Sequence, residues 1–293
     1  MAAAYDELLD ATIQHLEGLK ARGMRHIAVA PKTLRALALP VKTTAIPPPV
    51  PKTETTNSMP AKRIVAPVEP QAVVAPVRLP ITGSSPEKAG AFIELQARAL
   101  ACVKCPHLAS SRKNVVFGVG SIDAQLMFVG EAPGADEDAQ GEPFVGAAGQ
   151  LLTKIISATG LSRANVYIAN ILKCRPDTPG QSYGNRKPTP EEMATCIPYL
   201  HEQIDLIQPK VIVALGATAV EGLLGKTVGI TKLRGNWQVY RGTPLMPTFH
   251  PAYLLRNQAM SEKRKVWEDM LAAMEKLGMN ISEKQRNFFL KAQ

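Results

Sequence analysis

The sequence predicts an α/β protein with a mostly parallel sheet, because short apolar segments alternate with amphipathic segments along most of its length. The apolar segments have the length of buried strands, and the segments between them show the spacing of helices. We expect strands at residues 126–129, 166–171, 211–215 and 245–248. We expect helices at residues 86–101, 146–159, 190–207, 217–224 and 261–277.

Two of these helices have recognisable start signals. Ser85 precedes Pro86, which combines an N-cap residue with a proline at the first helical position. Thr189-Pro190-Glu191-Glu192 is a capping box, in which the threonine and the second glutamate bind each other's backbone N–H groups.

The connection between the first strand and the helix after it is long. It comprises residues 130–152, GEAPGADEDAQGEPFVGAAGQLL, with a tight turn that contains Glu131 and an acidic loop, 136–142, before Phe144. Such connections usually have about 2–6 residues. We therefore expect a ligand site at the carboxyl end of a parallel strand, with an ordinary connection as the alternative.

The composition divides the chain into four parts. Residues 1–39 predict a small helical head that could dock a protein partner, although a marginal helix is an equal alternative. Residues 40–84 predict a disordered, extended linker, since ten of the 24 prolines lie between residues 40 and 80. Residues 85–280 form the expected catalytic domain, and residues 281–293 a tail.

Composition and charge narrow the class of protein. A hydrophobic fraction of 45% supports a core, and a net charge of +9 suggests an anionic partner without separating nucleic acid from an acidic protein or a membrane surface. No apolar run reaches the roughly 18 residues of a membrane span. The N-terminus lacks the basic and apolar regions of a signal peptide, so we expect a cytoplasmic protein whose thiols stay reduced.

The four cysteines predict a metal centre. Cys102 and Cys105 have CxxC spacing and precede a proline, whereas Cys174 and Cys196 flank a loop far along the chain. Four thiolates suit tetrahedral zinc. They suit a [4Fe–4S] cluster equally well, because the ligands of such a cluster can be spread along the chain.

Two further residues have positions that suit base recognition or catalysis. Asn170 is expected at the end of a strand, where its amide can present a donor and an acceptor to a base edge, or can cap a turn. His250 directly follows a strand and precedes a proline, although a lone histidine is more often structural. Basic residues near them predict either phosphate contacts or a solvated surface: Lys226, Lys232, Arg234, Lys263, Arg264 and Lys265.

Three separated motifs resemble the family-4 uracil-DNA glycosylases. They are the 130–152 stretch, Asn170 with the KCRP sequence at 173–176, and HPAYLLRN at 250–257, and the similarity covers about residues 86–277. The resemblance implies a three-layer α/β/α sandwich around a short, mostly parallel sheet. It also implies an enzyme, which we expect to be a monomer, that flips deoxyuridine out of single- or double-stranded DNA and hydrolyses the N-glycosidic bond in base excision repair.

The same resemblance implies roles for individual residues. Phe144 would stack on uracil, Asn170 would bind its Watson–Crick edge, and His250 would donate to its O2. Glu131 would orient the attacking water or stabilise the sugar cation, while the backbone of Ala132 and Pro133 would line the pocket. A structural [4Fe–4S] cluster on Cys102, Cys105, Cys174 and Cys196 is favoured over zinc.

Two departures from the family pattern bear on mechanism. The loop between Cys174 and Cys196 is longer than family 4 leads us to expect, and a related group of covalent uracil-DNA binders has a sugar-attacking histidine there. This chain has Asn185 at that place and no histidine in the loop, which favours turnover. A uracil-DNA-binding or crosslinking module with weak turnover is the alternative. Ala132 cannot act as a base, so more of the chemistry would fall to Glu131.

Overall fold

The computed structural model describes residues 85–177, 185–225 and 228–290. Chain contacts separate Met1–Gln71 from Ala72–Gln293, and every described residue belongs to the second unit. The predicted head and linker lie outside the described residues.

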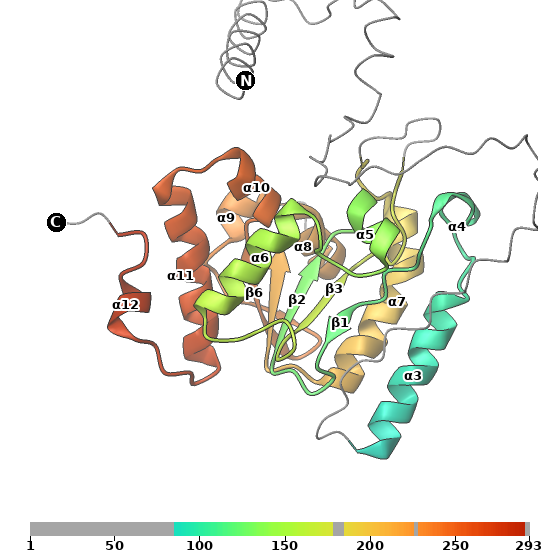
Figure 1. The fold of residues 1–293 in the computed structure, drawn as a ribbon, viewed down its shortest axis with the longest axis horizontal. Helices are drawn as coiled ribbons and strands as arrows, with labels where there is room; N and C mark the ends of the chain where they lie inside the picture. Colours follow the sequence, from blue (N-terminus) through green and yellow to red (C-terminus); the bar gives the residue numbers. More distant parts are fainter. Residues whose placement is uncertain (1–84, 178–184, 226–227, 291–293) are drawn as a thin grey trace, which may run out of the picture. The chain divides into compact units, whose positions relative to one another are not determined.

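A six-stranded sheet with the order β1-β3-β2-β4-β6-β5 forms the centre of this unit (Figure 1). The four inner strands are parallel, and the two edge strands pair antiparallel with their neighbours. All four expected strands are confirmed as the inner strands. The strands are β1 (Val119–Gly120), β2 (Leu126–Gly130), β3 (Tyr167–Asn170), β4 (Val211–Leu215), β5 (Gln238–Tyr240) and β6 (Thr243–Thr248).

Both edge strands were missed by the sequence analysis because they are short and only partly buried. Strand β5 is joined to β6 by Arg241 and Gly242, which both have positive φ, at 48° and 81°. A two-residue hairpin turn of the I′ type requires positive φ at both positions. The hairpin therefore places an antiparallel edge strand beside the parallel inner strands.

Helices cover both faces of the sheet, as expected for a three-layer sandwich. Figure 1 shows α3 and α7 on one side and α6 and α11 on the other. The longer helices are α3 (Pro86–Leu100), α6 (Ala147–Ala158), α7 (Pro190–Ile207), α8 (Ala217–Leu224) and α11 (Met260–Lys276). The shorter ones are α4 (Pro106–Ser111), α5 (Ala135–Gln140), α9 (Ile230–Leu233), α10 (Pro251–Arg256) and α12 (Glu283–Arg286).

Alternation along the strands produces the two cores. In β2, Met127 and Val129 pack with α3, α7 and α8, whereas Leu126 and Phe128 pack with α6 and α11. Successive side chains of a strand point to opposite faces. A strand buried on both faces is therefore apolar throughout, which explains why the inner strands were visible as continuous apolar runs.

Both expected helix starts are confirmed. The Ser85 hydroxyl accepts from the N–H of Lys88 at 3.2 Å. At the start of α7, Thr189 Oγ1 accepts from Glu192 N at 3.2 Å, and Glu192 Oε2 accepts from Thr189 N at 2.8 Å. These bonds satisfy N–H groups that have no partner within the helix.

The acidic stretch 136–142 was expected to be a loop, and this is wrong, because most of it forms α5. Two of its carboxylates act as local anchors. Glu137 accepts from the N–H of Gly134 at 3.0 Å, which caps the helix start. The buried Asp138 accepts from the N–H of Lys113 at 3.0 Å. The acidic residues thus satisfy backbone donors rather than facing solvent together.

Residues 281–290 pack on the sandwich. Helix α12 lies beside α11, where Trp267 Nε1 donates to the carbonyl oxygen of Gln285 and the ring of Phe288 lies 5.2 Å from the Trp267 ring. Gln285 Nε2 donates to the carbonyl oxygen of Ala158 at the end of α6. Among the helices of the described residues, none combines the length and apolar character of a membrane span.

Candidate active site

The carboxyl edge of the parallel strands brings together segments that are far apart in sequence. Gly130 ends β2 and is paired in register with Asn170, which ends β3. Two backbone bonds extend this pairing, from Ile171 N to the Gly130 oxygen and from Leu172 N to the Glu131 oxygen. Ligands of open α/β sheets bind at this edge, in the crevice where the strand order reverses.

Asn170 presents an unpaired acceptor at this edge. Its side chain is 2% exposed, and Oδ1 is the one buried side-chain nitrogen or oxygen of the described residues without a hydrogen-bond partner. Its backbone oxygen accepts from Lys173 Nζ at 3.0 Å, and that ammonium also donates to Gln203. An unpaired buried acceptor is costly, about 1–3 kcal/mol, and a ligand donor would remove this cost.

Gly130 makes room for Asn170 and for the ring of Phe144. A Cβ atom at position 130 would lie 2.4 Å from Asn170 Oδ1 and 2.6 Å from Phe144 Cζ. The side chains of Asn170 and Phe144 therefore pack on the same side of the backbone at the end of β2. The GEAPG motif predicted a functional turn here. Only the packing shows why its first position must be glycine.

Phe144 is buried and has a φ of 55°, a left-handed conformation that is rare for a bulky residue. Its ring centroid lies 5.6 Å from that of His250, with the planes inclined by 31°. The residues after it are held by Glu137, whose Oε1 accepts from Val145 N at 2.9 Å and Gly146 N at 3.0 Å. The sequence motif included Glu137 but gave no sign of this anchoring role.

His250 caps α10, with Nδ1 accepting from the N–H of Ala252 at 3.1 Å. Burial is the main cause that lowers the pKa of His250 to about 4; the charge of Arg256 adds to this and that of Glu137 opposes it. The ring is therefore neutral at pH 7. Because Nδ1 is an acceptor, the single ring proton is on Nε2, which leaves that nitrogen as a donor.

Glu131, Ala132 and Pro133 continue the chain from Gly130 at the same edge. Glu131 and Ala132 are half-buried, whereas Pro133 is buried. The structure places Asn170 and Phe144 against Gly130 and His250 beside the Phe144 ring, while Glu131 follows Gly130 in the chain.

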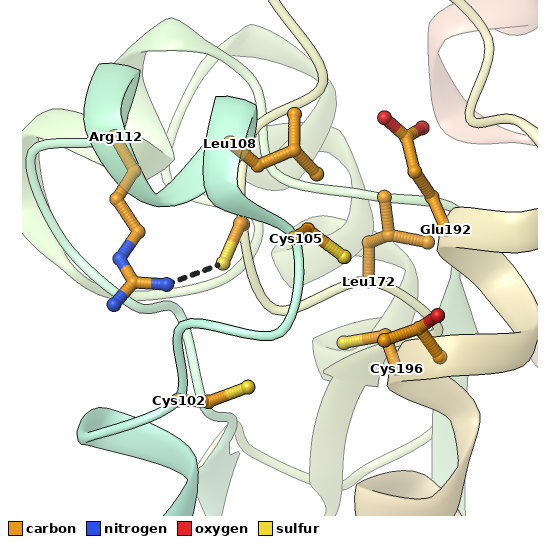
Figure 2. A pocket seen from close by; sticks show the side chains of 9 residues that line it. Cys102, Cys105, Leu108, Arg112, Leu172, Glu192 and Cys196 are labelled. Carbon is orange, nitrogen blue, oxygen red and sulfur yellow. Dashed lines mark hydrogen bonds between the residues drawn. The ribbon is translucent and has the colours of Figure 1, made fainter.

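The four cysteines line a cavity, with Leu108, Arg112, Leu172, Glu192 and Thr195 as its other lining residues (Figure 2). Cys102 and Cys105 come from the α3–α4 connection, Cys174 follows β3, and Cys196 lies on α7. Figure 2 shows the sulfurs of Cys102, Cys105 and Cys196 spread around one space rather than in contact. All four are free thiols.

Two of these sulfurs accept hydrogen bonds from the protein. Arg112 Nη1 donates to Cys174 Sγ at 3.1 Å, and Lys173 N donates to Cys196 Sγ at 3.2 Å. Burial is the main cause that raises the pKa of Cys105 and Cys174, and it raises that of Cys196 to about 11. A bound cation reverses this effect, because it stabilises the thiolate.

Among the described residues, no three His, Cys, Asp or Glu side chains converge closely enough to hold a single metal ion. Tetrahedral zinc with Zn–S bonds of about 2.3 Å would need its sulfurs within roughly 4 Å of one another. Four cysteines around one space supply thiolate ligands of the kind that zinc or an iron–sulfur cluster would need.

Several basic residues expected near phosphates have other partners. Arg234 is 14% exposed and forms an ion pair with Asp269, which is 1% exposed and also accepts from Thr248. Arg264 pairs with Glu268 and donates to the carbonyl oxygens of Arg286 and Phe288. Arg234 is thus partly buried and paired, and its phosphate role stays a prediction. Lys226 lies outside the described residues.

The chain is similar to known uracil-DNA glycosylases. The family model of the uracil DNA glycosylase superfamily matches residues 117–271. A type-4 uracil-DNA glycosylase of Thermotoga maritima is 50% identical over 178 residues, which are 59% of this chain and 88% of that protein. A type-4 enzyme of Sulfurisphaera tokodaii is 39% identical over 206 residues, 67% of this chain and 89% of its own.

A type-5 uracil-DNA glycosylase of Pyrobaculum aerophilum is more distant, at 29% identity over 198 residues, 56% of this chain and 84% of that protein. The family match covers all six strands, and it includes Phe144, Asn170 and His250. The sandwich, the carboxyl-edge pocket and these similarities agree. The chain belongs to the uracil-DNA glycosylase superfamily.

Proposed function

We propose that this protein is a uracil-DNA glycosylase that acts on uracil-containing DNA, single- or double-stranded, releases free uracil and leaves an abasic site for base excision repair. One observation carries the proposal: the unpaired Asn170 Oδ1 lies buried beside an aromatic ring and a neutral histidine, in a chain of this superfamily. A base reaches such a pocket only when flipped out of the stack, at a cost of a few kcal/mol.

Complementary hydrogen bonds support uracil as the base. Asn170 Oδ1 accepts from uracil N3–H, and the same amide donates to O4 through Nδ2. Cytosine presents an acceptor at N3 and a donor at C4, so both bonds would be lost and buried groups left unpaired. Stacking on Phe144 adds about 1–3 kcal/mol for any flat base, so Asn170 provides the discrimination.

His250 supports the departure of the base. As the bond between C1′ and N1 breaks, negative charge moves onto uracil, and the Nε2–H of His250 donates to O2. A fixed donor aimed at developing charge is often the largest catalytic contribution. Because the ring is neutral before the reaction, it stabilises the uracil anion without first transferring a proton to it.

Glu131 is proposed to act on the sugar side. Its carboxylate orients the attacking water or stabilises the positive charge at C1′, and Ala132 has no group that could replace it. The water oxygen bonds to C1′, and the released proton balances the uracil anion. The backbone of Ala132 and Pro133 lines the same pocket.

A uracil-containing oligonucleotide tests the proposal. Purified protein is expected to release free uracil and to leave an alkali-labile site, whereas an undamaged oligonucleotide stays intact. A heat-stable protein–DNA adduct without release would instead identify a crosslinking module.

Asn185 stands where covalent binders have their histidine, and its Oδ1 accepts from Arg175 Nε at 2.9 Å. An amide is a poor nucleophile, which favours turnover.

We also propose that Cys102, Cys105, Cys174 and Cys196 hold a [4Fe–4S] cluster. The spread of the sulfurs around one space and the N–H groups directed at Cys174 and Cys196 support this assignment. The cluster would cross-link α3, β3 and α7, and hydrolysis requires no redox step from it. Four irons and four sulfides per chain, with a brown colour that Cys174→Ser bleaches, are expected. Stoichiometric zinc in colourless protein would contradict the assignment.

A further inference from the structure

Arg163 donates hydrogen bonds to backbone carbonyl oxygens rather than to a carboxylate. It lies in the connection between α6 and β3, where Nη1 donates to the carbonyl oxygen of Phe144 at 3.1 Å and Nη2 to that of Pro143 at 2.7 Å. Six other described arginines pair with carboxylates: Arg98, Arg186, Arg234, Arg241, Arg264 and Arg286. Arg163 is instead directed at two successive peptide oxygens.

Holding the Arg163 guanidinium against carbonyl oxygens costs solvation free energy. Burial is the main cause that lowers the pKa of Arg163, with the charges of Glu142 and Glu137 opposing it. Placing a partly desolvated cation against neutral carbonyls loses water contacts without the gain of an ion pair. The two bonds hold the backbone of Pro143 and Phe144.

Phe144 has such a conformation. Its φ of 55° is strained for an aromatic residue, and its carbonyl group packs against Gly149 so closely that a Cβ there would lie 1.9 Å from both atoms. Glu137 holds the next two N–H groups, those of Val145 and Gly146. The peptide is thus fixed from one side by a cation at its oxygens and from the other by an anion at the following amides.

We propose that Arg163 is a positioning residue for base stacking: it locks the left-handed backbone of Phe144 and so directs the ring across the pocket between Gly130 and His250. This inference rests on the proposed function, since the stacked group is the flipped base. Arg163 itself does not touch the base. Without its two donors, the peptide relaxes toward negative φ, and the ring turns away from His250.

Three variants test the proposal. Arg163→Met keeps the length of the side chain and removes every donor, Arg163→Lys restores a cation with donors, and Arg98→Met is a control far from the pocket that removes an exposed ion pair with Glu202. Arg163→Met should weaken binding to an oligonucleotide with a non-cleavable deoxyuridine analogue about tenfold, in proportion to the lost stacking. Binding to an undamaged oligonucleotide should not change. Arg163→Lys should recover part of the loss.

A double-mutant cycle separates positioning from general destabilisation. In a Phe144→Ala background, Arg163→Met should have little further effect on the single-turnover rate, because the group it positions is absent. Equal losses in both backgrounds would overturn the proposal. So would wild-type binding and rate in Arg163→Met.

A spectroscopic measurement keeps this test independent of the activity. The Phe144 ring lies close enough to shift the proton resonances of the His250 imidazole, and Arg163→Met should move these resonances toward their ordinary values while Arg98→Met should not. Unmoved resonances would refute the positioning role. Absence of uracil release by the wild type would contradict the proposed function alone and leave the resonance result to decide on Arg163.

Discussion

Replacing His250 by alanine removes the donor proposed to face uracil O2. The neutral ring keeps its proton on Nε2, because Nδ1 accepts from Ala252 N. Loss of one fixed donor to developing negative charge costs about 2.7–4 kcal/mol, or roughly 10²–10³ in rate. Affinity for a non-cleavable deoxyuridine oligonucleotide should change much less, since the charge on O2 develops only in the transition state. Single-turnover excision beside equilibrium binding measures both quantities.

The pH dependence gives a second measure of the same residue. With a pKa of about 4 in the folded protein, His250 stays neutral from pH 5 to 8, and its titration should cause no step in the excision rate there. The unfolded chain binds this proton near pH 6.5, so stability falls as the pH drops from 6.5 to 4. The maximum loss is about 3 kcal/mol, and His250→Ala should abolish it.

A second histidine provides the control. His201 hydrogen-bonds Tyr240 at 2.6 Å and lies on α7, so His201→Gln should keep the wild-type excision rate. A wild-type single-turnover rate in His250→Ala would refute the proposed role. An excision rate with an apparent pKa near 6.5 that disappears in His250→Ala would show that the ring acts in its charged form, against the reasoning from burial.

Three other substitutions have separate expected outcomes. Asn170→Asp should reduce uracil excision and permit slight cytosine excision, measured on matched uracil and cytosine oligonucleotides; unchanged selectivity would contradict the base-reading role. Gly130→Ala places a methyl group against Asn170 Oδ1 and Phe144, so excision should fall by at least about tenfold, roughly 1.4 kcal/mol of barrier, with the circular dichroism spectrum retained. Arg234→Met leaves Asp269 buried without its ion pair and should lower the free energy of unfolding by about 3 kcal/mol in urea. The salt dependence of its DNA binding should match that of the wild type, and a weaker dependence would support the phosphate role.

The fold was predictable where local signals agree with the global structure. The inner strands are continuous apolar runs, and α7 has both a capping box and an apolar face, so their bounds follow closely from the sequence. Edge strands β1 and β5 have two and three residues, too few for a periodic pattern. Helix α5 escaped prediction because its acidic residues satisfy backbone donors in neighbouring segments, and the sequence does not show those contacts.

The pocket was predictable in its residue types and not in its geometry. The motifs indicated Phe144, Asn170 and His250, but not the positive φ of Phe144 or the unpaired oxygen of Asn170. Arg163 gave no signal at all, since its partners are peptide oxygens 19 and 20 residues away, and any residue type has such oxygens. The sequence likewise gave no sign of the ion pair of Arg234, because its partner Asp269 lies 35 residues away.

Because of the strand order in the sheet, the uracil-excision activity should depend on the folding of the whole sheet. Gly130 ends β2, Asn170 ends β3, and His250 lies two residues after β6. These strands come together only after β4 has entered the sheet between β2 and β6. No hairpin or single helical unit contains the pocket, so partial unfolding of the central strands cannot preserve it. Excision should therefore be lost with the same denaturation midpoint as the sheet itself, and the pocket should form late, after the slow pairing of distant strands.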